Sequence, residues 1–598
     1  MIHDSCFMIK NPSKKESLDH IRHSLAHLLA MAVLKKFPAA KLGIGPAIEH
    51  GFYYDFKLPR PISEADLAQF EQTMRELIAA KLDFKGKKVT PAKAKKLFKN
   101  QPFKLDLIKE FVKEKKQLTV YYTCPPAISS KLKAKNCFAD LCHGGHVKNT
   151  SEINPTAFKL ARIAGAYWRG SESNPQLTRI YGLAFGDKRE LDAHLKLQEE
   201  IARCDHRIIG EKLDLFSQHA VAPGTIFWHP KGMMLWRILE EFIREKNAAY
   251  GYGEVQTPVM VKKELFETSG HWEHYRENGF WFAIDGETYV LKPMNCPEAA
   301  LIYAARLRSY RDLPIRLAEP TGRLHRNELA GVLGGLFRTR QFTQDDAHIF
   351  CRPDQIGTEI KTLIRYAKEV YAAVELPVSF RLATRPDNAL GAPKLWKQAE
   401  EALKRVLEAS AIGYETKPKD GAFYGPKIDI HAKDAIGREH QLATIQLDFQ
   451  MPLRFKLAYI DEQGTKQTPV MIHRAVLGSF ERFIGVLIEH YAGAFPLWLA
   501  PLQLAVLAVN DAASPYCRSV EAELKRRGWR VTMDERKETI GRKIREAELA
   551  KIPYLLVIGE REAAAKTVSV RERGKGDRGA VKLEVFLKTI AEERMPPR

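Results

Sequence analysis

Long apolar runs are missing from this sequence of 598 residues. A helix needs about 18 or more consecutive apolar residues to span a bilayer, and no stretch of the chain provides them. The start of the sequence also lacks the apolar segment of a secretory signal peptide. These absences argue against a membrane or secreted protein and predict a cytoplasmic protein without a membrane partner.

Cysteine is scarce and irregularly placed. The eight cysteines show no disulfide-like spacing, which fits a reducing compartment. The sequence also has no HExxH motif, which would place a general base beside two metal-binding histidines. That absence argues against a zinc hydrolase. No internal repeat or low-complexity tract appears.

Acidic residues are outnumbered by basic ones, 73 against 94, and the formal net charge is +21. Such a balance favours a polyanionic partner through phosphate contacts and counterion release. Taken alone, it fits tRNA, another nucleic acid or an acidic surface. The hydrophobic content of 45% is that of a globular protein, and the length implies several domains.

Cys296, His348 and His473 lie far apart in the sequence but form a chemically coherent set. One thiolate and two imidazoles suit zinc, and three protein ligands leave a position open for water or substrate. Their spacing carries no local metal motif. A small buried cysteine and two ordinary polar histidines are therefore the alternative reading.

A Gly-rich turn divides residues 321–344 into two apolar and aromatic halves, which predicts two antiparallel strands. The hairpin would carry Arg326, Glu328 and Arg338. Planar guanidinium groups suit phosphate charge, although each arginine taken singly could form a surface ion pair.

Two further segments flank this hairpin. Residues 232–250 form a predicted helix that leads into a strand ending at Pro258, and Gly478 to Arg482 lead into an apolar-periodic helix. A helix and strand ending in proline, an Arg-x-Glu hairpin and a Gly…Glu-Arg helix, in this order, resemble motifs 1, 2 and 3 of class II aminoacyl-tRNA synthetases. Because motif 1 forms a dimer interface across that class, the resemblance implies a homodimer.

Within class II, the sequence is similar to the threonyl-tRNA synthetase family from about residue 17 to its end. The matching segments are Lys-Pro-Met-Asn-Cys-Pro (292–297), Gln-Phe-Thr-Gln-Asp-Asp-Ala-His-Ile-Phe (341–350), Phe-Tyr-Gly-Pro-Lys-Ile (423–428), Gln-Leu-Asp-Phe (446–449) and Pro-Val-Met-Ile-His-Arg (469–474). The resemblance implies ATP-dependent attachment of L-threonine to tRNA(Thr) through a threonyl-adenylate, with Mg²⁺ accompanying ATP. The alternative is a synthetase-like regulatory or binding protein without ligase activity.

The resemblance also assigns residues to a synthetic site. A zinc ion in each subunit would be held by Cys296, His348 and His473. It would bind the amino and hydroxyl groups of threonine, whereas an apolar pocket separates threonine poorly from valine. Arg326 and Arg338 would face the α-phosphate of ATP, Arg482 the γ-phosphate and Glu328 the adenine, and the remaining ATP contacts would be Phe342, Gln441 and Thr444. The residues around threonine would be Met294, Gln344, Asp346, Tyr424 and Gln446.

A second constellation lies near the N-terminus. His23 and His27 share one helical face, and Cys142 and His146 are likewise four residues apart. This quartet resembles a metal site, but solvated histidines and a loop cysteine are an alternative. Together with Gly-Phe-Tyr-Tyr-Asp (51–55) and Ala-Gly-Ala-Tyr-Trp-Arg-Gly (164–170), it resembles the editing domain of the threonyl enzymes. That resemblance implies metal-free hydrolysis of mischarged seryl-tRNA, with Tyr54 and Asp140 in the same pocket, although Gly145 stands where the family commonly has proline.

Strands alternate with helices after Pro501, which predicts an α/β layer fold. This part resembles the anticodon-binding domain of class II synthetases, with anticodon contacts at Lys537, Glu562 and Arg571. Lys537 departs from the asparagine that is common in the family. The basic residues expected to reach phosphates are Lys525, Arg526, Arg527, Arg536, Lys537, Arg542, Lys543 and Arg545.

The predicted architecture is a multidomain chain that mixes α+β and α/β folds. Its parts are an N-terminal α+β editing domain, a class II antiparallel-sheet catalytic core and a C-terminal α/β anticodon-binding domain. Many family members also carry a β-grasp module ahead of the editing domain, and this sequence is expected to lack it. The predicted boundaries are a flexible segment at 1–16, the editing domain at 17–200, a helical connector at 201–222, the catalytic domain at 223–498 and the anticodon-binding domain at 499–598.

Overall fold

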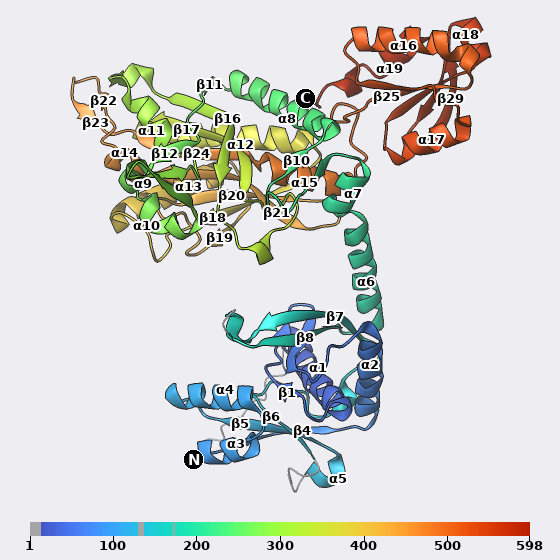
Figure 1. The fold of residues 1–598 in the computed structure, drawn as a ribbon. Helices are drawn as coiled ribbons and strands as arrows, with labels where there is room; N and C mark the ends of the chain where they lie inside the picture. The colour runs from blue at the N-terminus through green and yellow to red at the C-terminus, as the bar shows by residue number, and fades with distance from the viewer. Residues whose placement is uncertain (1–13, 130–136, 172–173, 598) are drawn as a thin grey trace, which may run out of the picture. The chain divides into compact units, whose positions relative to one another are not determined.

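The computed structural model describes residues 14–129, 137–171 and 174–597, and the chain divides into two compact units at Glu199 and Glu200 (Figure 1). Most of the predicted flexible segment, 1–16, lies outside the described residues. Residues 14–16 are already helical, because the first helix, α1, runs over Lys14–Lys36. Among the described helices, none combines the length and the apolar character needed to cross a membrane.

The first unit is built around α1, which is buried on most of its circumference. Its leucines and alanines pack on α2 (Glu64–Ala79) and on one face of a sheet in the order β1-β3-β8-β7, with β2 paired to β3. Because α1 is enclosed, its histidines His23 and His27 point into protein rather than into solvent. The strands are β1 (Lys41–Leu42), β2 (Ala47–Ile48), β3 (Gly51–Lys57), β7 (Phe158–Tyr167) and β8 (Gln176–Ala184).

A smaller antiparallel sheet completes the first unit, in the order β4-β5-β6. It places Asp140 and Cys142 at the end of its last strand. A disulfide joins Cys124 to Cys137, which the irregular cysteine spacing did not predict. The strands are β4 (Asp83–Lys88), β5 (Thr119–Cys124) and β6 (Phe138–Leu141), and the nearby helices are α3 (Pro91–Leu97), α4 (Pro102–Lys113) and α5 (Pro126–Ser129).

The connector was expected to be helical over 201–222. One helix, α6 (Lys188–Arg203), begins earlier and reaches only the start of this segment, whereas α7 (His206–Lys212) lies within it. The remainder of the expected segment contains the start of a small ribbon, in which β9 (Phe216–Ser217) pairs with β10 (Phe227–Trp228).

The central sheet of the second unit runs in the order β11-β16-β17-β24-β21-β20-β18-β19 (Figure 1). Its pairs are antiparallel except at the two edges, where β11 with β16 and β18 with β19 are parallel. The predicted strand ending at Pro258 is confirmed only as a two-residue edge strand. The bounds are β11 (Gly253–Glu254), β16 (Ile315–His325), β17 (Gln341–Cys351), β18 (Val378–Ala383), β19 (Tyr414–Lys417), β20 (Lys427–Lys433), β21 (Glu439–Asp448) and β24 (Val470–Ser479).

Alternation along the strands separates the two faces of this sheet. Ile349, Ile445 and Ile472 pack with helices in the main apolar core. Because neighbouring residues of a strand point to opposite faces, His348 and His473 lie on the other face. The helices of the core are α8 (Pro230–Ala249), α12 (Ile356–Ala373), α13 (Pro393–Ala409) and α15 (Phe480–His490), of which α8 and α15 match the predicted helices.

Shorter elements border the face that carries the histidines. The sheet β12-β14-β13 and the ribbon β15-β22-β23 are its additional strands. Their bounds are β12 (Met260–Lys262), β13 (Phe280–Ile284), β14 (Glu287–Leu291), β15 (Arg308–Ser309), β22 (Tyr459–Ile460) and β23 (Lys466–Gln467), with α9 (Lys263–Ser269), α10 (His271–Tyr275), α11 (Cys296–Ala304) and α14 (Gln450–Arg454).

The C-terminal part forms a sheet in the order β26-β25-β27-β28-β29, flanked by helices (Figure 1). The predicted alternation of strands and helices after Pro501 is confirmed, within a few residues at each end. The elements are β25 (Leu504–Ala508), α16 (Ser514–Arg526), β26 (Val531–Asp534), α17 (Ile540–Leu549), β27 (Tyr554–Ile558), α18 (Glu560–Ala565), β28 (Val568–Glu572), β29 (Gly576–Val581) and α19 (Leu583–Thr589).

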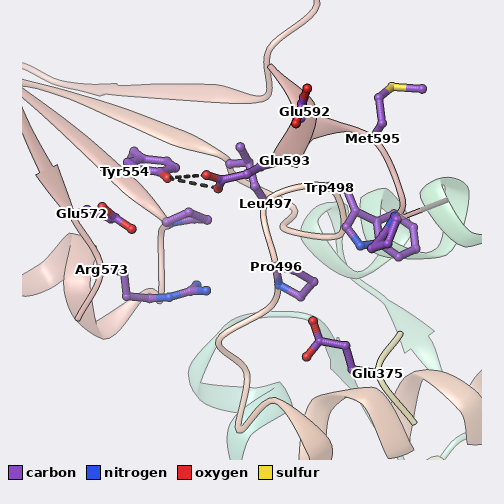
Figure 2. Close-up of a pocket in the computed structure, with 12 residues that line it drawn as sticks. Glu375, Pro496, Leu497, Trp498, Tyr554, Glu572, Arg573, Glu592, Glu593 and Met595 are labelled. Carbon is purple, nitrogen blue, oxygen red and sulfur yellow. Dashed lines mark hydrogen bonds between the residues drawn. The ribbon is translucent and has the colours of Figure 1, made fainter. Parts of the chain in front are cut away.

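Two arginines of this C-terminal part hold the segment that follows α15. Arg573 donates to the carbonyls of Ala494 and Phe495, at 2.9 and 2.6 Å, and Arg530 donates to the carbonyls of residues 497, 498 and 500. A cavity of about 430 Å³ lies beside this segment, with Arg573 directed toward Pro496 (Figure 2). No residue assigned from the sequence to catalysis or binding lines it.

Candidate active site

Cys296, His348 and His473 come together on the open face of the central sheet. His348 and His473 are directly opposite each other on β17 and β24, and Cys296 is the first residue of α11. One ligand atom from each lies within 4.8 Å of the other two, and all three residues are buried. Residues that are 52 and 125 positions apart in the sequence therefore form one cluster.

The surroundings of the cluster suit a metal. Asp448 accepts a hydrogen bond from Nε2 of His473 at 3.0 Å, which leaves Nδ1 of His473 free to bind a cation. A second-shell carboxylate of this kind commonly orients a ligating histidine. Burial raises the pKa of the Cys296 thiol, so a neighbouring cation is needed to hold the thiolate. The donor set of one sulfur and two imidazoles fits zinc.

The residues expected around threonine border the same cluster. Gln446 lies opposite His473 in the sheet and accepts a hydrogen bond from the hydroxyl of Tyr424, whose ring packs 4.9 Å from that of His473. Asp346 accepts from Asn295 at 2.9 Å, and burial raises the pKa of its carboxyl to about 6.

Met294 and Gln344 lie at two borders of this region. Met294 packs against the apolar cluster that contains Cys296. Gln344 lies opposite Ser479 in the sheet, next to a bulge between β17 and β24. Gln344 also lines the cavity of about 410 Å³ described below, which contains the residues expected to bind ATP.

Sequence reasoning missed His271 on α10. Its Nε2 lies 3.9 Å from the Cys296 sulfur, and its Nδ1 is 2.8 Å from the Ser269 hydroxyl. Burial, with a further contribution from the charge of His473, lowers the pKa of His271 to about 3, so the ring is neutral. The sequence around His271 contains no spacing motif that would have identified it.

A cavity of about 410 Å³ adjoins this region and contains the residues expected to bind ATP. It lies where the loop between β16 and β17 meets β21 and the start of α15. Among its lining residues are Arg326, Glu328, Arg338, Phe342, Gln344, Gln441, Thr444 and Arg482.

Arg326, Glu328 and Arg338 are not on the strands of the predicted hairpin. β16 ends at His325 and β17 begins at Gln341, so all three lie in the connecting loop. The hairpin itself is confirmed. A loop rather than a strand suits residues that must converge on one ligand, because its side chains need not alternate between two faces.

Ion pairs order this loop. Arg338 donates two hydrogen bonds to one oxygen of Glu328, at 3.1 and 2.9 Å, and Arg326 lies 3.7 Å from the other oxygen. Arg340, which the sequence reading did not assign, donates to the main-chain carbonyl of Glu328 at 2.9 and 2.8 Å.

Arg482 is a further cation of the cavity. Its Nε is buried without a hydrogen-bond partner among the described residues. Burial, together with the charge of Arg338, lowers the pKa of its guanidinium. An unpaired guanidinium facing a cavity lined by further arginines is suited to an anion such as a polyphosphate.

In the first unit, His23, His27, Cys142 and His146 also lie close together. The Cys142 sulfur lies 3.4 Å from Nε2 of His23 and 3.3 Å from Nε2 of His146, and His27 lies within the same group. Gly145 has a φ of +81°, a conformation that glycine adopts without strain.

Asp140 contacts several residues next to the quartet of His23, His27, Cys142 and His146. It accepts a hydrogen bond from the Tyr54 hydroxyl at 2.5 Å and lies 3.7 Å from Nε2 of His27. Lys104, which the sequence reading missed, is buried and forms an ion pair with Asp140 at 2.5 Å. Ser24, also missed, lies 3.2 Å from Nδ1 of His146. Lys104 is one of three lysines on α4, and nothing in the sequence distinguished it from the other two.

Burial sets the protonation states in this pocket. It lowers the pKa values of His23, His27 and His146 and raises the pKa of the Cys142 thiol to about 11. The three imidazoles and the thiol are therefore neutral near pH 7. Neutral imidazoles can accept hydrogen bonds from water or from a ribose hydroxyl and so orient them.

The residues expected to read an anticodon differ in exposure and in whether their polar atoms already have hydrogen-bond partners. Lys537 is almost fully exposed, with its Nζ 3.8 Å from Asp511. Glu562 accepts from the Gly559 N–H at 2.9 Å and so caps α18. Arg571 on β28 has a buried Nε without a partner among the described residues.

The set of basic side chains expected to reach phosphates needs one correction. Lys543 is 2% exposed and donates to the Ala508 carbonyl at 2.7 Å, so it stabilises the domain instead of facing solvent. Arg536 and Arg542 remain at the surface, where both pair with Glu546.

Comparison with known families agrees with this arrangement. Residues 280–491 match the tRNA synthetase class II core domain (G, H, P, S and T). Residues 503–593 match an anticodon binding domain, and residues 122–181 match the threonyl and alanyl tRNA synthetase second additional domain. The predicted fold class, with its three kinds of domain, is confirmed.

Individual relatives are similar over nearly the whole chain. The threonine–tRNA ligase of Acetivibrio thermocellus is 47% identical over 578 residues, covering 96% of this chain and 88% of the relative. Threonine–tRNA ligase 2 of Bacillus subtilis is 46% identical over 585 residues, covering 98% and 89%.

Solved structures give the same result. The RNA binding domain of threonyl-tRNA synthetase from Cryptosporidium parvum matches with a TM-score of 0.64 and 43% identity, covering 66% of this chain and 99% of that one. Giardia lamblia prolyl-tRNA synthetase, at 16% identity and a TM-score of 0.54, shares the fold alone. By the extent and identity of these matches, the chain belongs to the threonyl-tRNA synthetase family.

Proposed function

We propose that this chain attaches L-threonine to tRNA(Thr) in an ATP-dependent reaction through a threonyl-adenylate. The proposal rests on one observation: the cluster expected to bind threonine and the cavity expected to bind ATP adjoin each other on one sheet. The cluster of Cys296, His348 and His473 lies on the same strands that border the cavity lined by Arg326 and Arg482. An amino acid bound at the first site would present its carboxylate to a nucleotide bound at the second.

Cys296, His348 and His473 would hold a zinc ion. When bound, zinc would supply a Lewis acid with a position open to the amino and hydroxyl groups of threonine. Asp448 fixes the orientation of His473, and Asn295 holds Asp346 where its carboxyl could accept from the substrate hydroxyl. Valine lacks that hydroxyl and would leave Asp346 without its partner.

The other residues of the amino acid site would position the substrate. Tyr424 and Gln446 form a hydrogen-bonded pair beside His473, and Met294 would close the apolar side toward the methyl group. Gln344 would lie close to the carboxylate, because it borders both the sheet face and the ATP cavity.

The arginines of the cavity would bind ATP together with Mg²⁺. Arg326 and Arg338 would contact the α-phosphate, where negative charge grows during attack by the threonine carboxylate, and Arg482 would contact the γ-phosphate. Charge-stabilising groups held in advance of the reaction lower its barrier. Glu328 would accept from the adenine amino group, Phe342 would lie against the base, and Gln441 and Thr444 would reach the ribose.

We also propose that the first unit hydrolyses seryl-tRNA formed in error. Serine offers zinc the same amino and hydroxyl groups as threonine, so the synthetic site separates them only by a methyl group, worth about 10–200-fold. His23, His27, Cys142 and His146 would orient water against the ester. Tyr54 and Asp140 would fix these groups from below, as their hydrogen bond indicates.

The C-terminal domain would read the anticodon of tRNA(Thr). Arg571, with its unpaired Nε, and Glu562 would reach base edges, and Lys537 would contact a phosphate or a base edge. Phosphate contacts set position, and base contacts set specificity. The net charge of +21 supports a polyanionic partner.

A homodimer is part of the proposal. Apolar side chains are exposed on the β12-β14-β13 sheet and on α8, and a second copy would cover them. They include Met234, Met260, Trp281, Phe282 and Ile284. We propose a cytoplasmic location, because Cys142 and Cys296 are free thiols at sites where oxidation would interfere with the chemistry, although Cys124 and Cys137 form a disulfide.

Amino-acid-dependent exchange of pyrophosphate with ATP tests the ligase function. Threonine should support rapid exchange, serine slower exchange and proline none. Exchange that depends on proline, or that is absent with all three amino acids, would contradict the proposal. The alternative of a ligase-like binding protein is less favoured, since the residues proposed to hold zinc lie in one cluster and the arginines proposed to bind ATP line one cavity.

A further inference from the structure

His206 is buried although it stands at the N-terminus of a short helix. It is the first residue of α7 and only 3% exposed, whereas its neighbours Arg207 and Ile208 are exposed. Asp205 caps the helix by accepting from the Arg207 N–H at 2.8 Å. A buried imidazole needs a partner for each ring nitrogen, and both partners are present.

The two partners belong to different parts of the synthetic site. Glu489, on α15, accepts from Nδ1 of His206 at 2.6 Å and from its main-chain N–H at 3.0 Å. The Leu336 N–H points to Nε2 at 2.9 Å. These partners assign the neutral tautomer with the proton on Nδ1, because Nε2 must accept. The His206 ring thus links α15 to the loop between β16 and β17 by hydrogen bonds.

The loop is shaped around this ring. Gly335 has a φ of +55°, and a Cβ added there would lie 2.2 Å from Nε2 of His206. The Phe337 ring packs 4.3 Å from the imidazole. Hydrogen bonds from Gly334 to the Arg338 carbonyl, at 3.2 Å, and from Phe337 to the Gly334 carbonyl, at 3.0 Å, close the turn. The side chains of Phe337 and Arg338 then line the ATP cavity.

Glu489 is fixed from its other side. Arg438 forms an ion pair with Glu489 and with Asp434, and Asp434 also accepts from His440 at 2.9 Å. Arg438 and His440 flank the beginning of β21, which carries Gln441 into the same cavity. The carboxylate that holds His206 is therefore itself held in place by neighbours of an ATP-site strand.

Asp205, His206 and Glu489 are close enough to suggest a metal site, but their donor atoms are already used. Asp205 accepts from Arg207, Glu489 accepts from Arg438 and His206, and Nδ1 of His206 carries a proton. No lone pair of the imidazole is left for a cation. The cluster is better explained as a hydrogen-bonded support.

We propose that His206 is a positioning residue for ATP, which acts by holding the turn at residues 334–338 so that Phe337 and Arg338 face the nucleotide. The inference rests on the proposed ligase function. The His206 ring joins α7 to this turn directly, through the hydrogen bond that Nε2 accepts from the Leu336 N–H.

Two conservative variants separate the functions of the two ring nitrogens. His206→Asn keeps an amide donor near Nδ1 for Glu489 but places no acceptor near Leu336. His206→Gln places a carbonyl oxygen near the position of Nε2 and so can accept from Leu336. In threonine-dependent pyrophosphate exchange, His206→Asn should raise the KM for ATP by about tenfold or more, because a buried N–H loses its acceptor. His206→Gln should recover most of that loss.

The KM for threonine should change little in both variants, because the turn does not border the cluster at Cys296. His229→Asn is the matched control, since His229 also stands at a helix N-terminus and bonds a carboxylate, Asp214, through Nδ1 at 2.7 Å. Its KM for ATP should stay at the wild-type value. Equal KM values for ATP in the Asn and Gln variants, or losses that follow only the melting temperature, would overturn the proposal.

A second pair of variants keeps the test decisive if His206→Asn does not fold. Gly335→Ala pushes a methyl group against Nε2 and should also raise the KM for ATP, whereas Gly331→Ala, in the same loop with open space around it, should not. Equal values for these two variants would reject the role of His206. A wild-type protein without any pyrophosphate exchange would instead refute the ligase function.

Discussion

Arg474 and Asp345 form an ion pair sealed inside the second unit, directly behind the candidate active site. The Arg474 Nη1 lies 2.6 Å from Oδ1 of Asp345, and both side chains are fully buried. Oδ2 of Asp345 accepts from the main chain at Val476 and Leu477. Because Arg474 follows His473 and Asp345 precedes Asp346, this pair fixes the strands from which the site residues project on the opposite face.

Breaking this pair should destabilise the protein severely. Removing one partner leaves the other charge buried and unpaired, which typically costs about 3–5 kcal/mol. Arg474→Met should lower the free energy of unfolding by that amount in urea denaturation followed by tryptophan fluorescence. Lys246→Met, which removes a partly exposed ion pair to Glu369, should cost less than about 1 kcal/mol. Similar losses in the two variants would contradict the assignment.

Local patterns predicted the elements of the fold that have their own periodicity. The helix around His23 and His27, the helices α8 and α15 and the alternating strands and helices after Pro501 are of this kind. The edge strand before Pro258 was overestimated, because its two paired residues are set by the neighbouring strand β16 and not by the composition of the segment.

The candidate site was predicted through motifs, and its supporting residues were not. Cys296, His348 and His473 stand in recognisable segments, so their meeting on one sheet face could be expected. Lys104, His206 and His271 lie in segments without a motif, and each has a partner more than 20 residues away in the sequence. Such partners are fixed by tertiary packing, which a single sequence does not specify.

Cys296 should be required for metal binding and for threonine activation. Cys296→Ser exchanges a thiolate for a hydroxyl, which is a much poorer zinc ligand, so bound zinc and pyrophosphate exchange should fall together. Zinc is measured by elemental analysis of the purified protein. Cys204→Ser, at a free cysteine away from the cluster, should retain both zinc and activity. Full exchange activity in a zinc-free Cys296→Ser protein would refute the metal site.

Arg482 should act on ATP. Its guanidinium is partly buried, unpaired at Nε and placed beside Arg338, so its replacement by alanine removes a preorganised cation from the cavity. Loss of one such group typically lowers the rate by about 10²–10³-fold. Pyrophosphate exchange by Arg482→Ala should show this decrease in kcat. Arg405→Ala, on the exposed side of α13, is the control and should leave the rate unchanged.

Arg571 should contribute to anticodon recognition without affecting adenylate formation. Arg571→Ala should lower kcat/KM for charging tRNA(Thr) by about tenfold or more, since a base contact is typically worth about 1–3 kcal/mol. Pyrophosphate exchange, which needs no tRNA, should stay at the wild-type rate. The matched control is Arg578→Ala, because Arg578 is exposed and pairs with Glu572 on the same sheet. An equal effect of the two substitutions on charging would remove Arg571 from the contact surface.

The quartet of the first unit should hydrolyse seryl-tRNA that carries a threonine anticodon. The double variant His23→Ala, Cys142→Ala removes two of the groups that surround the pocket and should abolish deacylation while leaving pyrophosphate exchange intact. His143→Ala is the matched control, since His143 lies in the same loop but is exposed and packs on Phe111.

The pH dependence of this hydrolysis has a definite sign. Burial lowers the pKa of His23 below its usual value of 6.5, so the neutral ring predominates down to pH 6.5. Deacylation should therefore decrease with a midpoint below pH 6.5, where the imidazole gains a proton. A midpoint at or above pH 7 would show that an exposed histidine limits the reaction, and equal hydrolysis by the double variant and the intact protein would place editing outside this pocket.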